Sequence, residues 1–120
     1  MAQLINKMLT EGINDLDELE SLGKDLARSV KTSQIRKFFG SMRRIQADFT
    51  NLKHEIVMLE PRLAYAKGKA KGDSQAGLDK LYKNLGPMVK EIKGDKSKFD
   101  NFVQIVEAIV AYHKYYNGVE

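Results

Sequence analysis

The amino-acid sequence predicts an all-α protein, a compact bundle of about five helices in a single helical-bundle domain covering residues 1–120. Apolar residues recur at alternating spacings of three and four from residue 32 onward, which is the pattern of a helix packed against other helices. Only two prolines occur, while Leu, Lys, Ala and Glu are plentiful, and these residues favour helices. No stretch alternates apolar and polar residues as a half-buried strand would.

Composition excludes several classes of protein. With 42% hydrophobic residues the chain can bury a core, so intrinsic disorder is not expected. Cysteine is absent, which excludes a disulfide scaffold, a thiolate metal site and a cysteine nucleophile. No apolar run approaches the ~18 residues needed to cross a membrane, and the first residues lack the pattern of a signal peptide. We therefore expect a cytoplasmic protein with no membrane partner.

The first helix is expected over residues 3–11, with Gly12 as its stop. Asn14 is expected to cap a second helix, because its side-chain oxygen can accept a hydrogen bond from an unpaired backbone N–H. Thr32 or Ser33 is expected to cap the third helix for the same reason. The expected buried stripe of the second helix consists of Leu16, Leu19, Leu26 and Val30.

The helical stretch that follows is long, and we expect it to be broken or kinked between residues 48 and 61. Asp, Thr and Asn gather at its weak point, Asp48–Asn51, and Pro61 removes a helix hydrogen bond. A new helix beginning near Leu59 would accommodate the proline in its first turn. The apolar seam of the stretch consists of Ile35, Phe38, Met42, Ile45, Phe49, Leu52, Ile56, Leu59, Leu63 and Ala66.

A basic loop punctuated by glycine is expected over residues 68–73. The helix after it is expected to begin at Asp73 or Ser74 and to be kinked at the Gly-Pro pair of residues 86–87.

The last helix is expected after a turn at Gly94, with Asp95 or Ser97 as its cap. Asn117 and Gly118 are expected to end it. Its apolar stripe consists of Phe99, Phe102, Val103, Val106, Ile109, Val110 and His113.

Net charge is +4, and it is distributed unevenly along the chain. Residues 1–23 carry one basic and five acidic side chains, whereas residues 24–72 carry twelve basic and four acidic ones. Residues 73–120 carry seven of each. This asymmetry favours an oriented polyanionic partner over uniform solubilisation, although a helical bundle can also acquire it by chance.

Most basic side chains of the central region gather in two sections. Helical spacing places Arg36, Arg43 and Arg44 of the first basic section on one side, and Gly40 among them would let a phosphate backbone approach closely. Tyr65 lies in the second basic section, where it either stacks on a base or packs against its own bundle. For both sections the alternative is a solvated surface. The candidate RNA-binding residues are Arg36, Lys37, Arg43 and Arg44 in the first section, Arg62, Lys67, Lys69 and Lys71 in the second, and Lys53 between them.

No catalytic or metal site is recognisable. His54 and His113 have no His or Glu at i+3 or i+4 that would make a helical metal pair. Because His113 follows the apolar stripe of the last helix, we expect a hydrogen-bonded core histidine there. The run GKAKGDS lacks the residue order of a phosphate-binding loop. We therefore expect no enzyme activity, no metal and no cofactor.

The chain contains TSQIRKFF at residues 32–39, LEPRLAYAKGK at residues 59–69 and FVQIVEAIVAYHKYYNG at residues 102–118. In order, spacing and combination these segments resemble the small subunit of type III-A CRISPR effector complexes, the Csm small subunit family. Two positions depart from the family pattern. Glu60 precedes the proline where the family usually has a basic residue, and Lys69 stands where arginine is common. Lysine keeps the charge but loses planar bidentate contact.

The resemblance implies a small helical protein present in several copies per complex, stacked along guide RNA and target RNA beside a filament of backbone subunits. It implies no catalytic role, because target RNA cutting belongs to the backbone subunit, and DNA cutting and nucleotide signalling belong to the large subunit. The implied partners are guide RNA, single-stranded target RNA, the backbone and large subunits, and neighbouring copies of the chain. The family's basic positions correspond to Arg36, Arg62 and Lys69.

Two hypotheses describe the basic surface. The first is a non-catalytic, RNA-binding structural subunit that clamps phosphate without reading sequence, because guide pairing supplies the sequence information. The second is a helical adaptor whose basic face binds an acidic protein partner. Only the first predicts strongly salt-dependent binding of single-stranded RNA.

Overall fold

The computed structural model describes residues 2–116 of the chain, and side chains from residue 7 onward. The described residues contain six α-helices of ten residues or more and no strand, which confirms the all-α class, with about five helices expected. The elements are α1 (Ala2–Glu11), α2 (Asp17–Ala27), α3 (Thr32–Ala47), the short α4 (Phe49–Leu52), the 3-10 helix η1 (Lys53–Met58), α5 (Leu59–Lys69), α6 (Asp73–Ile92) and α7 (Lys96–Tyr115).

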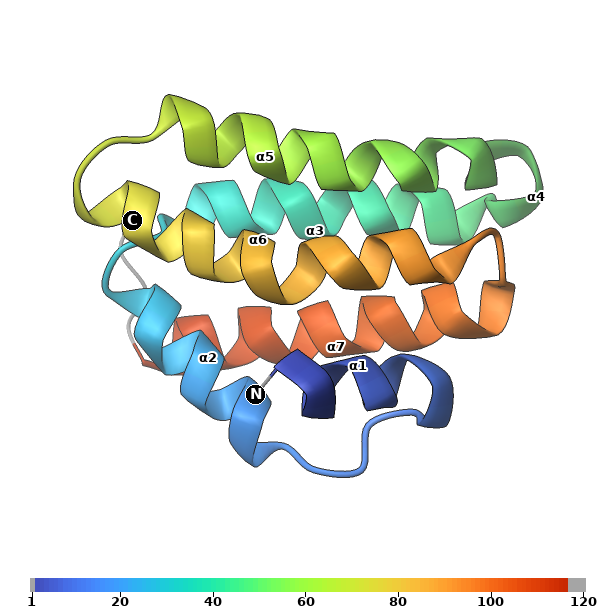
Figure 1. Cartoon of the computed structure of the whole chain (residues 1–120), viewed down its shortest axis with the longest axis horizontal. Coiled ribbons are helices and arrows are strands. Elements are labelled where there is room, and N and C mark those ends of the chain that lie inside the picture. Colours follow the sequence, from blue (N-terminus) through green and yellow to red (C-terminus); the bar gives the residue numbers. More distant parts are fainter. Residues whose placement is uncertain (1, 117–120) are drawn as a thin grey trace.

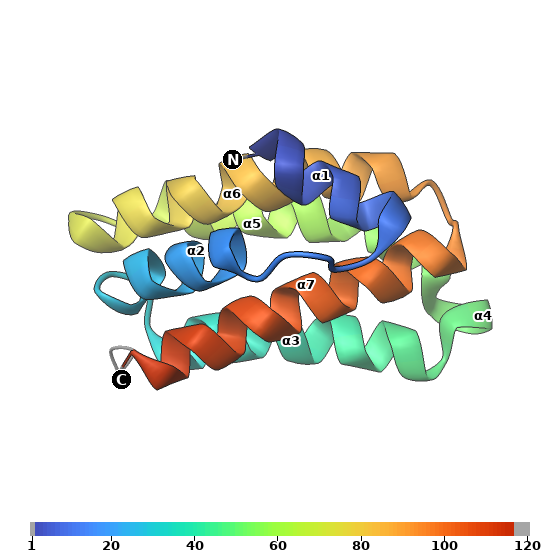
Figure 2. The same cartoon turned by 90° about the horizontal axis from the view of Figure 1, so that it is seen from below.

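The four helices that dominate the bundle alternate in direction. In Figure 1, α3 and α6 run one way along the long axis, and α5 and α7 run the other way. Figure 2 shows two layers, with α1, α5 and α6 in one layer and α3 and α7 in the other. Helix α2 lies between the layers at one end. None of the described helices combines the length and apolar character needed to cross a membrane.

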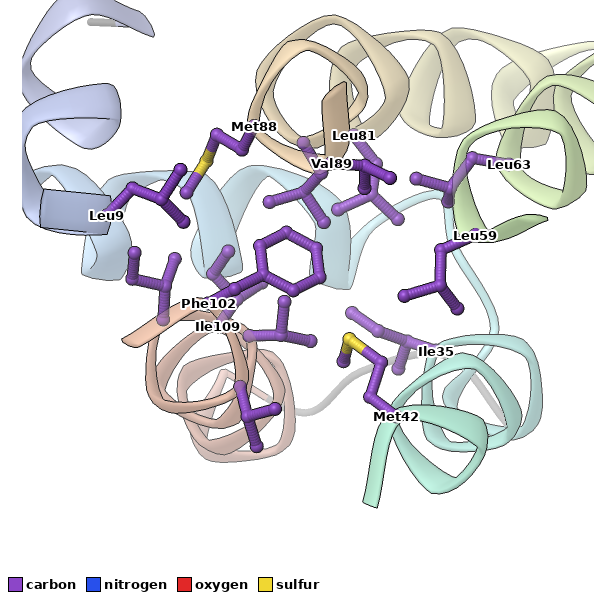
Figure 3. Packing of buried hydrophobic residues seen from close by; sticks show 14 of the residues in the cluster. Leu9, Ile35, Met42, Leu59, Leu63, Leu81, Met88, Val89, Phe102 and Ile109 are labelled. Atoms are coloured by element: carbon purple, nitrogen blue, oxygen red, sulfur yellow. The ribbon is translucent and has the colours of Figure 1, made fainter. Parts of the chain in front are cut away.

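One hydrophobic core joins the helices, because side chains from α1, α3, α5, α6 and α7 converge between the layers (Figure 3). Phe102 of α7 lies near the middle of this view and is fully buried. The predicted seam is confirmed. Six of its members are buried, namely Ile35, Met42, Ile45, Ile56, Leu59 and Leu63, and the other four, Phe38, Phe49, Leu52 and Ala66, are partly buried against the core.

The predicted break in the long helical stretch is confirmed, and it is a complete reversal of the chain. Asp48 leaves helical geometry, with φ −138° and ψ 56°, and ends α3. After α4 and η1 the chain returns as α5, antiparallel to α3 (Figure 1). Helix α5 begins at Leu59, so Pro61 lies in its first turn, where its missing N–H costs little.

Several local expectations are wrong at helix starts. Helix α2 begins at Asp17, and the carboxylate of Asp15, not the side chain of Asn14, accepts the N–H of Asp17 at 2.9 Å. Leu16 precedes this helix and is 47% exposed, so it does not belong to the buried stripe.

The expected cap of α3 is also wrong. Lys31 is the N-cap residue, and neither Thr32 nor Ser33 has that role. The Oγ1 atom of Thr32 is buried without a hydrogen-bond partner among the described residues. Instead, the side-chain oxygen of Gln34, in the first turn of α3, accepts the backbone N–H of the cap residue Lys31 at 3.3 Å.

The second half of the chain follows the prediction more closely. Gly68 and Lys69 form the last turn of α5, so the loop before α6 is shorter than expected and covers residues 70–72. Helix α6 is one continuous helix that includes Pro87, the position at which a kink is predicted. Asp95 caps α7 by accepting the Lys98 N–H at 3.1 Å, as predicted. The expected stop at residues 117–118 lies outside the described part of the chain.

Helices α2 and α7 approach each other closely at Gly23. A Cβ atom on Gly23 would lie 2.6 Å from the Cβ of Tyr112, so only glycine fits there. Beside this contact, His113 is fully buried and its Nε2 donates a hydrogen bond to the Val30 carbonyl oxygen at 2.6 Å. The prediction of a hydrogen-bonded core histidine is therefore confirmed.

Candidate nucleic-acid interface

A groove of about 690 Å³ lies between α3 and α5, with α6 beneath it, and we call it the α3–α5 groove. The chain reversal creates it, since the start of α3 comes to lie beside the end of α5 (Figure 1). Its lining contains four basic side chains and no acidic one. The basic residues are Lys31, Lys37, Arg62 and Lys69, and the apolar ones include Ile35, Phe38, Leu63, Ala66, Leu78 and Leu81.

Helical spacing explains why these side chains share one groove. On α3, Gln34, Lys37 and Ser41 follow one another at three and four residues, so they lie along one side of the helix. On α5, Arg62 and Lys69 lie seven residues apart with Tyr65 between them, again on one side. The groove therefore joins Lys37 of the first basic section to Arg62 and Lys69 of the second.

Two arginines of the candidate set converge on one carboxylate. Arg44 forms an ion pair with Glu55 of η1, and the Nη2 atom of Arg62 lies 3.9 Å from the same carboxylate oxygen. Both guanidinium groups are about half exposed, so these pairs add little stability. A guanidinium has five N–H donors, and each arginine keeps donors for a phosphate.

Lys67 has a different role from its neighbours, because it faces α6 and not the groove. Its Nζ lies 2.6 Å from a carboxylate oxygen of Asp79 and 5.7 Å from the centre of the Tyr82 ring. Lys83 reaches the same carboxylate at 3.0 Å. The hydrogen bonds from Lys67 and Lys83 lower the pKa of Asp79 below its ordinary value. Lys67 thus ties α5 to α6.

The expectation that Arg36, Arg43 and Arg44 share one side of α3 is wrong for Arg44, because the first basic section is divided between two sides of the helix. Arg43 donates to Gln46 at 3.3 Å, and Gln46 in turn donates to Asp100 of α7 at 3.1 Å. Arg43 therefore lies toward α7, whereas Arg44 lies toward η1. Gly40 and Arg36 share the side of Arg43 by helical spacing. A Cβ atom added at Gly40 would meet nothing within 4 Å, so this surface is open.

Other basic residues complete the distribution. Lys53 lines a smaller pocket of about 170 Å³ together with Lys90 and Lys93, near the end of α6. Lys71 is exposed in the loop after α5. Lys31, Lys90 and Lys93 are not among the residues predicted from the sequence. The spacing of Lys31 to Gln34 and Phe38 could have indicated the first, but only tertiary packing brings the other two beside Lys53.

Tyr65 and Glu60 have opposite environments on α5. Tyr65 is 71% exposed, and the Nζ of Lys69 lies 6.0 Å from the centre of its ring. Glu60, the acidic departure from the family pattern, accepts a hydrogen bond from the Tyr82 hydroxyl. This bond raises the pKa of Tyr82 above its ordinary value. The carboxylate of Glu60 is thus engaged with α6 and does not line the α3–α5 groove.

A metal site is not indicated, because no cluster of three or more His, Asp or Glu side chains able to hold an ion occurs among the described residues.

A family model described as Csm2 Type III-A matches residues 11–119 of the chain. The chain belongs to this family. The match confirms the resemblance found in the three sequence segments. Searches of curated proteins and of solved structures gave no significant match.

Membership of the Csm2 family makes the chain a structural subunit of a type III-A CRISPR effector complex, assembled with other Csm subunits. The family is the small subunit of that complex.

Proposed function

We propose that this Csm2 protein is a non-catalytic RNA-binding subunit that stacks in several copies along guide RNA and target RNA, in contact with the backbone and large subunits, in the cytoplasm. It clamps the phosphate backbone without reading sequence. The observation that carries the proposal is the α3–α5 groove, whose lining has four basic side chains, from the cap of α3, α3 itself and α5, and no acidic one. A polyanion is the partner that such a lining attracts.

The local contacts rank the candidate residues. Lys37 and Lys69 line the groove, and no ion pair involves either among the described residues. Arg62 lines it as well and shares Glu55 with Arg44. We assign the main phosphate contacts to Lys37, Arg62 and Lys69, with Lys31 added.

The remaining candidates are assigned a lesser part. Arg36 and Arg43 contact RNA on the open side of α3 around Gly40. Lys53 and Lys71 extend the basic surface at its two ends. Lys67 contributes least, because Asp79 already neutralises it.

Lack of sequence preference follows from the same chemistry. Phosphate contacts carry no base information, and in a guided complex the guide strand supplies the specificity. Each neutralised phosphate also releases counterions, so affinity falls steeply as salt rises.

The proposal is tested with a double charge reversal in the groove, Lys37→Glu with Lys69→Glu, in the full chain. Binding of single-stranded RNA is measured by fluorescence anisotropy over a series of salt concentrations. We expect the affinity at low salt to fall by about 100-fold. The slope of log affinity against log salt should become less steep by the amount that about two phosphate contacts contribute.

The matched control reverses Lys7 and Lys24 on α1 and α2, which lie on the other side of the bundle from α5 in Figure 1 and give the same change in net charge. If both double variants lost affinity equally, net charge and not the groove would explain binding. If neither lost affinity while an acidic protein partner still bound, the adaptor hypothesis would replace this one.

A further inference from the structure

We propose that the α3–α5 groove holds an unpaired nucleobase stacked on Tyr65, while the basic rim holds the phosphates on either side of it. This inference rests on the proposed RNA-binding function and goes beyond phosphate clamping. It assigns the apolar part of the groove, which a phosphate clamp alone does not need.

The lining of the groove has two chemical parts that match the two parts of a nucleotide. Leu63 and Ala66 of α5 and Leu78 of α6 belong to an apolar surface, which suits the face of a base. Lys37 and Lys69 belong to the cationic rim, which suits phosphate. The volume of about 690 Å³ is in the range of sites that enclose small organic groups.

Of the two aromatic side chains that line the groove, Tyr65 is the one suited to stacking, because Phe38 is partly buried against the core. Its ring is 71% exposed and has no hydrogen-bond partner among the described residues. By contrast, the hydroxyls of Tyr82 and Tyr116 donate to Glu60 and Glu20, so those rings are held by the fold. The Nζ of Lys69 lies over the Tyr65 ring, 6.0 Å from its centre. A base would therefore stack on the other face of the ring, with this cation near enough to pair with an adjoining phosphate.

The polar groups of the groove predict little preference between bases. The Ser41 hydroxyl donates to the Phe38 carbonyl oxygen at 2.7 Å, and the Gln34 side-chain oxygen accepts the Lys31 N–H at 3.3 Å. These bonds hold the Gln34 oxygen and the Ser41 hydroxyl hydrogen, so fewer polar atoms are left to read the edge of a base. Stacking tolerates every base, since each has an aromatic face.

An acidic amphipathic helix of a partner protein is the competing occupant. Such a helix uses apolar anchors spread over successive turns, and it would cover the exposed tyrosine without using its ring face. The exposed aromatic ring with a lysine beside it, at the rim of a pocket of limited volume, favours a nucleotide.

The test compares two probes of equal length at low salt: a dye-labelled oligouridylate and an oligomer with the same ribose-phosphate backbone but no bases. We expect the full chain to bind the oligouridylate about tenfold more tightly than the abasic probe. Tyr65→Ala is expected to remove this preference while keeping its affinity for the abasic probe. Tyr115→Ala, which removes a tyrosine of similar exposure from α7, is expected to keep the preference.

The outcomes separate the two proposals. If the wild-type chain bound both probes equally, base insertion would be wrong and phosphate clamping would stand. If it bound neither probe but bound a helical glutamate-rich peptide, both proposals would fail and the groove would be a protein-docking site. Circular dichroism of Tyr65→Ala checks that the fold is intact, and we expect no change because the side chain is exposed.

Discussion

At the scale of single residues, the basic side chains of this Csm2 protein are not equivalent. Lys67 is held by Asp79, and Arg44 is paired with Glu55, whereas Lys37 and Lys69 line the groove without an ion pair in the described part of the chain. Charge alone does not distinguish them in the sequence. The distinction comes from which acidic residue the fold brings near each one.

Gly40 gives a prediction with two opposite effects. It lies in α3 without a positive φ, and a Cβ atom there would meet nothing within 4 Å. Gly40→Ala is therefore expected to raise the free energy of unfolding by about 1 kcal/mol. If a phosphate approaches the backbone there, the added methyl group weakens RNA binding by about fivefold, the equivalent of one hydrogen bond. Urea denaturation and fluorescence anisotropy measure the two effects.

Gly68→Ala serves as the comparison, since Gly68 also has open space around it in α5. We expect it to increase stability without changing RNA affinity. A Gly40→Ala variant that bound RNA as well as the wild type would show that phosphate does not approach this part of α3.

At the scale of helices, much could be predicted from the sequence and some could not. The spacing of the seam identified the buried face of α3 and α5, because burial is a local consequence of helical periodicity. The break after residue 47 was visible in the residues around Asp48. The reversal of chain direction could not be predicted from these residues, because core packing decides where α5 lies relative to α3. The capping residues of α2 and α3 were misjudged because several neighbouring polar side chains can satisfy the same N–H.

The same limit applied to the candidate site. Helical spacing wrongly placed Arg44 on the side of Arg36 and Arg43, and it could not show that Lys37 and Lys69, far apart in the sequence, line one groove. Nor could it show that Arg44 turns toward η1 while Arg43 turns toward α7. Both facts depend on tertiary contacts that no local pattern encodes.

The contact between α5 and α6 predicts a dependence of stability on pH. Hydrogen bonds from Lys67 and Lys83 hold the pKa of Asp79 below its ordinary value of 3.8. A carboxyl whose pKa is lowered in the folded state stabilises the fold above its unfolded pKa, and the effect is lost as pH falls through the folded pKa. The melting temperature of Asp79→Asn should therefore be below that of the wild type at neutral pH, and the gap should narrow below about pH 4.

Glu107→Gln is the control, because Glu107 is an exposed carboxylate of α7 with no ion pair among the described residues. Its melting temperature should follow that of the wild type at both pH values. A gap between Asp79→Asn and the wild type that stayed constant from neutral to acidic pH would contradict the assigned role of Lys67.

At the scale of the whole molecule, the fold separates charge in space as the sequence separates it along the chain. The acidic first turn of α2 and the basic α3 and α5 lie in different parts of a body that measures 37 × 30 × 22 Å. Under the proposed function, a polyanion binds the part of the bundle that holds α3 and α5. Contacts between distant segments hold this arrangement together, and one of the close ones joins α2 to α7 at Gly23.

Gly23→Ala is expected to destabilise the whole bundle. The new Cβ atom would lie 2.6 Å from the Tyr112 Cβ and 3.0 Å from the Ile109 carbonyl oxygen, so one helix must move. Overpacking of this kind costs about 1–3 kcal/mol, which exceeds the helix propensity that alanine adds. Urea denaturation should show a lower midpoint with an unchanged slope. The same substitution at Gly40 should move the midpoint the other way. A midpoint of Gly23→Ala at or above that of the wild type would refute the close approach of α2 and α7.

The hydrogen bond from His113 to the Val30 carbonyl oxygen has a consequence for the groove. Val30 and Lys31 line the groove, whereas no side chain of α7 does. Helix α7 nevertheless holds this part of the lining in place through the hydrogen bond of His113. A mutational scan confined to exposed basic positions would overlook this buried imidazole, although it fixes where the first lysine of the groove stands.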